Sequence, residues 1–142
     1  MWLRELFRSL YLSMGGRERP SPGDRVKGSQ ITYDKVNGVL RIQFAPTADI
    51  KIFNVDETKS MDGLMDVASN VIATGDFEHS MLKVGDIIIY QLHLSLIVHE
   101  IIKIKEDIHG RLYQCRGINN VNADRYWVRD IQIKYVYLGQ FD

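Results

Sequence analysis

The sequence is poor in cysteine and carries no excess of charge of either sign. Cys115 is the single cysteine among 142 residues, which excludes an internal disulfide and a cysteine-rich zinc site. We expect it to be a half-buried thiol on a strand. Lysine plus arginine number 18, and aspartate plus glutamate also number 18. No overall field therefore attracts nucleic acid or an anionic surface, and we expect no nucleic-acid partner.

Long apolar runs and metal-site spacings are also lacking. No run reaches the roughly 20 residues that a transmembrane helix needs, and the first residues lack a small-residue cleavage site. We expect no transmembrane segment and a cytoplasmic or virion-associated protein, with peripheral membrane contact as an alternative. His79, His93 and His109 have no spaced acidic or cysteine partners, so we expect surface histidines, no metal and no cofactor.

Apolar residues recur at helical spacing in residues 1–14, which predicts an amphipathic N-terminal helix. They are Trp2, Leu3, Leu6, Phe7, Leu10, Tyr11 and Met14. The apolar face of this helix could dock on the rest of the chain, join a partner or a second copy, or lie on a membrane. Residues 15–23, GGRERPSPG, have the composition of a linker. We therefore place a domain boundary there and assign residues 24–142 to one β domain.

From residue 24 onward, short runs of β-forming residues alternate with turn signals, which predicts a mainly β fold with one N-terminal helix. Asn37-Gly38, between residues 30–36 and 39–44, is the strongest short hairpin signal. Residues 64–67 are expected to form a helical turn or a bend. Further strands are predicted at 49–55, 71–74, 86–92, 97–105 and 111–116, with one or two more within 126–141.

Two residue types point to nucleophilic chemistry. Ser60 follows the strand predicted at 49–55, and His99 lies within an apolar, β-branched run, where a polar ring needs a partner. A serine hydroxyl attacks only when a neighbour takes its proton, which a neutral imidazole can do near neutral pH. The alternatives are a solvated serine and a core histidine bonded to backbone groups.

Four segments follow one another in the order TKSMDG (58–63), LKVGDIIIY (82–90), LIVHEIIKI (96–104) and GINNVNAD (117–124). In order and spacing they resemble the serine peptidase clan that contains type I signal peptidases and LexA-type self-cleaving repressors. The resemblance covers about residues 50–140 and implies a LexA/signal-peptidase-like β-fold. The base-bearing strand of that clan carries His99 here, which implies the histidine subtype of archaeal and endoplasmic-reticulum enzymes. The lack of a membrane anchor looks more like small members encoded by phages.

The resemblance implies a role for each matching residue. Ser60 would be the nucleophile and His99 the general base, with Asp124 at the end of the fourth segment holding the other ring nitrogen. The backbone amide of Ser60 and the hydroxyl of Thr58, two residues earlier, would bind the oxyanion. An alternative for Asp124 is that it caps a turn.

Other residues in or next to the four segments compete with these roles or depart from the clan pattern. Ser80-Met81 is a rival pair, but too few residues separate Ser80 from Gly85 for the turn of the clan, so we favour Ser60. Asp86 is expected to shape the turn before its strand rather than do chemistry. Gly63 and Ile118 stand where the clan has proline and aspartate.

Two functions follow as hypotheses. The first is a serine endopeptidase that cleaves a peptide or precursor protein in trans, with the substrate lying along a sheet edge. Self-cleavage is not expected, because no helix-turn-helix precedes the domain. The second is a catalytically inactive relative that serves as a structural, assembly or protein-binding module, for example in a phage particle, joined through residues 1–14.

Overall fold

The computed structural model describes residues 23, 25–54 and 69–141, which form two antiparallel β-sheets. This confirms the prediction of a mainly β chain. Several predicted features lie outside the described residues: the helix over 1–14, most of the 15–23 linker, Thr58, Ser60, Gly63 and the turn over 64–67. In the described part of the chain, no helix has the length and apolar character needed to cross a membrane.

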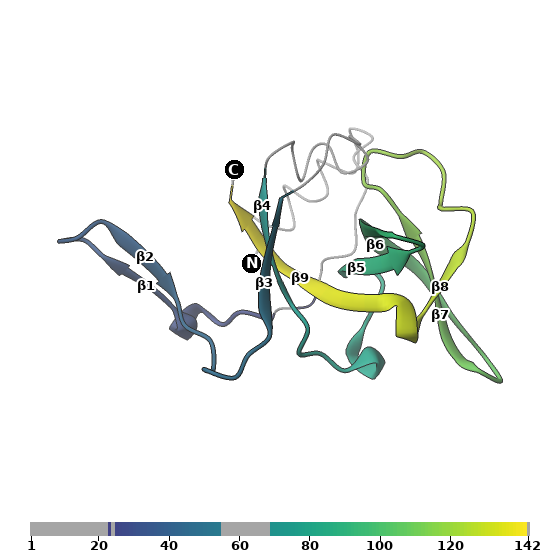
Figure 1. The fold of residues 1–142 in the computed structure, drawn as a ribbon, viewed down its shortest axis with the longest axis horizontal. Helices are drawn as coiled ribbons and strands as arrows, with labels where there is room; N and C mark the ends of the chain where they lie inside the picture. The colour runs from purple at the N-terminus through teal and green to yellow at the C-terminus, as the bar shows by residue number, and fades with distance from the viewer. Residues whose placement is uncertain (1–22, 24, 55–68, 142) are drawn as a thin grey trace, which may run out of the picture.

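The smaller sheet is the hairpin predicted from Asn37-Gly38. Strands β1 (Ile31–Asp34) and β2 (Val39–Ile42) pair antiparallel after the short 3-10 turn η1 (Gly28–Gln30). Gly38 has φ 64°, a left-handed conformation that glycine adopts without steric cost. The carboxylate of Asp34 accepts hydrogen bonds from the backbone amides of Val36 and Asn37 and so closes the turn. The hairpin projects away from the rest of the molecule (Figure 1).

The larger sheet has seven antiparallel strands in the order β3-β4-β9-β5-β6-β7-β8. Each predicted strand overlaps an observed one, and the segment 126–141 forms two strands separated by the 3-10 turn η3 (Asp130–Gln132). Strand β9 lies between β4 and β5 and is paired with both. The bounds are β3 Ile50–Asn54, β4 Asn70–Thr74, β5 Ile87–Leu92, β6 Ser95–Asp107, β7 Gly110–Arg116, β8 Trp127–Arg129 and β9 Ile133–Phe141.

Tight turns set the register of the strands that carry the candidate site. His93 has φ 53° in the turn from β5 to β6, and Gly110, the first residue of β7, has φ 107° directly after the turn from β6. Leu92 pairs with Ser95, so β6 begins two residues before the predicted strand over 97–105. With this register, Ile88 of β5 lies opposite His99 of β6.

The core consists of two apolar clusters, because successive side chains of β5 point to opposite faces of the sheet. Ile88 and Tyr90 belong to the first cluster, and Ile87 and Ile89 belong to the second. Both faces of this strand are therefore buried, which explains its continuous apolar run. Cys115 lies opposite Ile101 in the first cluster and is 0% exposed. The expectation of a half-buried thiol is wrong, because the side chain points to the sheet face that this apolar cluster covers.

Asp86 shapes the turn before β5, as predicted. Its backbone amide donates to the carbonyl of Lys83, and its carboxylate accepts from the amide of Lys83 at 3.0 Å. The same carboxylate is 1% exposed and accepts hydrogen bonds from the amide of Gly23 at 2.6 Å and the guanidinium of Arg25 at 2.9 Å. A buried carboxylate thus fixes the segment that leads into η1 against the start of the central strand.

Candidate functional site

His99 is held in the interior of the sheet by its position on β6. Strand alternation places it on the same face as Ile97 and Ile101, which pack in the first cluster, and the residue is 8% exposed. The ring of Tyr90 on the neighbouring strand meets the His99 ring edge to face, with 6.4 Å between centroids. A buried imidazole in such apolar surroundings must form hydrogen bonds within the protein.

Asp124 reaches His99 from the end of the loop over residues 117–124. The backbone amide of Asp124 donates to the carbonyl of Cys115 at 2.8 Å, which holds the end of this loop along β7. Its carboxylate Oδ2 lies 2.7 Å from Nδ1 of His99, and both side chains are 10% exposed. The structure therefore brings together two of the predicted site residues, from two separate motifs.

The partner of Nδ1 fixes the arrangement of protons on the ring. An ionised carboxylate only accepts hydrogen bonds, so Nδ1 of His99 carries the hydrogen in this contact. In the neutral ring, Nε2 then has the lone pair that can take up a proton. An imidazole held in this tautomer by a carboxylate is the arrangement that general-base catalysis uses.

Two tyrosines that the sequence analysis did not single out complete this group. The hydroxyl of Tyr90 donates to Oδ2 of Asp124 at 2.9 Å, and the hydroxyl of Tyr126 lies 3.3 Å from that of Tyr90. Burial raises the pKa of Tyr90 far above its ordinary value, helped by the hydrogen bond with Tyr126 and the charge of Asp124. The sequence does contain a signal for Tyr90, because the hydroxyl of a tyrosine inside an apolar strand requires a polar partner.

The other predicted residues fall elsewhere. Ser60 and Thr58 lie outside the described residues, and the rival Ser80 is exposed on the 3-10 turn η2 (His79–Met81). His93 is exposed as expected. His79 is half-buried, with Nε2 2.9 Å from the carbonyl oxygen of Asp130, so the prediction of a surface histidine there is wrong.

His109 is exposed, as expected. Among the described residues, no three histidine, cysteine, aspartate or glutamate side chains lie where they could share a metal ion. Among the hollows that described residues line, two are large enough to hold a ligand, and they differ in their relation to the His99–Asp124 pair.

The first hollow adjoins the pair. It has a volume of about 540 Å³ and is formed by residues 119–126, so Asp124 and Tyr126 both line it. Three asparagines, Asn119, Asn120 and Asn122, supply amide groups to the same surface. The loop that carries Asp124 thus presents an open concavity of mixed polar and apolar lining on the Asp124 side of the pair.

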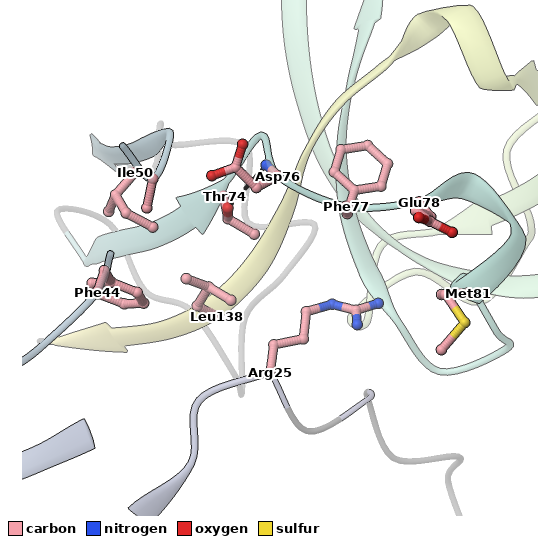
Figure 2. Close-up of a pocket in the computed structure, with 10 residues that line it drawn as sticks. Arg25, Phe44, Ile50, Thr74, Asp76, Phe77, Glu78, Met81 and Leu138 are labelled. Carbon is pink, nitrogen blue, oxygen red and sulfur yellow. Dashed lines mark hydrogen bonds between the residues drawn. The ribbon is translucent and has the colours of Figure 1, made fainter. Parts of the chain in front are cut away.

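The second hollow, of about 380 Å³, lies at the base of the hairpin, and neither His99 nor Asp124 lines it. Figure 2 shows the Arg25 side chain extending towards it from the segment before η1. Asp76 and Glu78 add two carboxylates to a mainly apolar lining. The apolar side chains are those of Phe44, Ala48, Ile50, Phe77, Met81 and Leu138.

Comparison with known proteins gives no match: no family model fits the chain, and no curated protein or solved structure is significantly similar to it. The resemblance to the signal peptidase and LexA clan therefore rests on the four segments, their order and the residues within them.

Proposed function

We propose that this chain is a serine endopeptidase of the signal peptidase and LexA-like type that uses histidine as its general base. The observation that supports the proposal most directly is the 2.7 Å contact between Nδ1 of His99 and Oδ2 of Asp124. The clan resemblance implies this pairing for two residues that are 25 positions apart. The active-site roles and the clan-specific fold remain part of the proposal.

In the proposed reaction, Oγ of Ser60 attacks the scissile carbonyl carbon while Nε2 of His99 takes the hydroxyl proton. The carboxylate of Asp124 stabilises the imidazolium that forms. The amide of Ser60 and the hydroxyl of Thr58 donate hydrogen bonds to the oxyanion. His99 then returns the proton to the leaving amine, and a water molecule hydrolyses the acyl-enzyme by the reverse sequence of proton transfers.

The proposed substrate is a peptide or precursor protein that binds as an added strand. In the described part of the chain, β3 and β8 end the larger sheet. Strand β3 is the favoured edge, because the chain runs on from Asn54 towards Ser60. The outward-facing Ile52 on this strand is 67% exposed and offers apolar contact to a paired peptide.

The test is cleavage of a pooled library of unstructured peptides, followed by mass spectrometry. We expect Ser60→Ala to lower the rate of cleavage by at least about 10³-fold, because the nucleophile is lost. Ser80→Ala is the matched control, since it removes the same hydroxyl from the second serine-methionine pair and should leave the rate unchanged. Loss of activity in Ser80→Ala with full activity in Ser60→Ala would show that Ser80, and not Ser60, is the nucleophile.

The role of Asp124 is tested in the same assay. Asp124→Asn keeps the shape of the side chain but removes the charge that stabilises the imidazolium and favours its tautomer. We expect a fall in kcat on the order of 10³- to 10⁴-fold with little change in KM. If Asp124→Asn keeps an activity within a few-fold of the unmodified protein, Asp124 has no catalytic role.

The second proposal, an inactive relative that acts as a binding or assembly module, is favoured by the exposed apolar face of the β1–β2 hairpin. The register places Ile31 opposite Ile42 and Tyr33 opposite Leu40, so these four side chains share one face. Tyr33 is 61% exposed and Leu40 49% exposed. Two results together would favour the module proposal over the enzyme proposal. The unmodified protein would cleave no peptide, and Tyr33→Ser would lower its self-association as measured by light scattering.

A further inference from the structure

Tyr90 donates its hydrogen bond to the same oxygen that His99 uses. Oδ2 of Asp124 lies 2.7 Å from Nδ1 of His99 and 2.9 Å from the hydroxyl of Tyr90. Tyr90 is on β5 and His99 on β6, so two neighbouring strands each supply one donor to a carboxylate that comes from a loop. Because two donors on a rigid sheet bind the Asp124 carboxylate, this side chain loses much of its freedom to rotate.

The hydrogens in this group can be assigned by counting. Tyr90 has one hydroxyl hydrogen, and the ionised carboxylate of Asp124 can only accept it. The hydroxyl of Tyr126, 3.3 Å from that of Tyr90, must then be the donor in their contact. The result is a directed chain in which Tyr126 donates to Tyr90, Tyr90 donates to Asp124, and His99 donates to the same carboxylate.

Tyr90 is suited to be a permanent donor. Tyr90 is 0% exposed, and burial together with the negative charge of Asp124 raises the pKa of its phenol far above the ordinary value. The hydroxyl therefore keeps its hydrogen throughout the pH range in which an enzyme of this kind would act. Other ionisable groups around the carboxylate are Tyr126 on the loop before β8 and the buried thiol of Cys115 on β7.

We propose that Tyr90 is a positioning residue that fixes the carboxylate of Asp124 and, through it, the ring of His99. Tyr126 supports this role by occupying the lone pair of the Tyr90 oxygen. The catalytic part of the inference rests on the proposed function, whereas the effect on the His99 ring does not. Without the hydroxyl of Tyr90, Asp124 can turn towards the loop hollow that it lines, and Nδ1 of His99 is less firmly held.

The alternative is that the contact with Asp124 only gives the buried hydroxyl of Tyr90 a hydrogen-bond partner and does not position His99. Tyr113 provides the matched control, because it is also 0% exposed and packs in the same apolar cluster. Its hydroxyl donates to the carboxylate Oδ1 of Asp130 at 2.7 Å, and so makes the same kind of contact away from His99. Tyr90→Phe and Tyr113→Phe each remove one buried hydroxyl bonded to a carboxylate, and only the first touches Asp124.

The measurement is nuclear magnetic resonance of protein labelled with ¹⁵N in its histidine rings, with His99→Gln used to assign the signals. We expect a protected Nδ1 proton on His99 in the unmodified protein. In Tyr90→Phe its exchange with water should be faster by about tenfold, the factor that corresponds to one lost hydrogen bond. Tyr113→Phe should leave that rate unchanged. An unchanged rate in Tyr90→Phe, or an equal increase in both variants, would overturn the proposal.

Peptide cleavage supplies the second readout. In Tyr90→Phe we expect kcat to fall on the order of tenfold with KM unchanged, because the base is misplaced and substrate binding is not affected. If the unmodified protein cleaves no peptide but Tyr90→Phe loosens the His99 ring, the proposed function fails and the positioning role of Tyr90 stands. If cleavage is found and the variant retains full kcat and a protected ring proton, Tyr90 has no positioning role.

Discussion

Replacing Asp86 by asparagine tests how strongly the buried carboxylate stabilises the fold. Oδ1 of Asp86 accepts from the amide of Gly23, and Oδ2 accepts from the guanidinium of Arg25 and the amide of Lys83. An asparagine side chain has one oxygen and one NH₂ group in these two places. Whichever way the amide is turned, at least one N–H donor then faces another donor, and Arg25 loses its counter-charge.

The size of the effect follows from burial. Asp86 is 1% exposed and Arg25 is 18% exposed on its side chain, so water replaces the lost contacts only from the arginine side. Breaking a buried ion pair costs about 3 to 5 kcal/mol. Because asparagine retains one accepting oxygen, we expect Asp86→Asn to lower the free energy of unfolding by about 3 kcal/mol. The melting temperature should fall by roughly 10 to 15 °C.

Urea unfolding followed by tryptophan fluorescence measures this change. Asp49→Asn is the matched control, because it makes the same substitution in a carboxylate that pairs with Lys51 at 3.4 Å, with the two side chains 46% and 50% exposed. We expect the control to cost less than about 1 kcal/mol, since exposed pairs contribute little. A loss below about 1 kcal/mol in Asp86→Asn, or equal losses in the two variants, would refute the reasoning.

Three further predictions concern single residues. The two hydrogen bonds from Arg129 hold the pKa of Asp107 at about 2, below its ordinary 3.8, so the stabilising effect of this carboxylate is present above about pH 4 and is lost towards pH 2. Arg129→Ala should return that pKa towards 3.8 in a ¹³C titration, and an unchanged value would contradict the assignment. Cys115 should not react with a thiol reagent until the protein unfolds, because the thiol is buried and burial raises its pKa. Gly38→Ala, at φ 64°, should destabilise the hairpin by about 1 kcal/mol and speed amide exchange in β1 and β2 but not in β6.

Local signals in the sequence predicted the strands well. The hairpin at Asn37-Gly38 and the turn between the strands predicted at 97–105 and 111–116 both form, because their geometry depends on a few adjacent residues. The turn role of Asp86 was predicted for the same reason. The position of β9 between β4 and β5 was not predicted, since pairing between distant strands leaves no local trace.

Contacts across long sequence distances account for what the sequence analysis missed. The hydrogen bond from Arg25 to Asp86 spans 61 positions, and nothing near either residue indicates it. The sequence places Tyr90 only within the strand predicted at 86–92, and its contact with Asp124 depends on how distant segments pack together. The contact of His99 with Asp124 was expected only because of the clan resemblance, and the catalytic roles of both residues remain a prediction.

The position of β9 between β4 and β5 has a consequence for synthesis on the ribosome. Strands β3 and β4 on one side and β5 to β8 on the other are joined within the larger sheet through β9, which spans Ile133–Phe141. The nascent polypeptide therefore exposes two unpaired sheet edges until this late segment leaves the exit tunnel. Such edges can pair with other chains, so the nascent chain is most prone to aggregate until residues 133–141 have emerged and β9 has paired with β4 and β5.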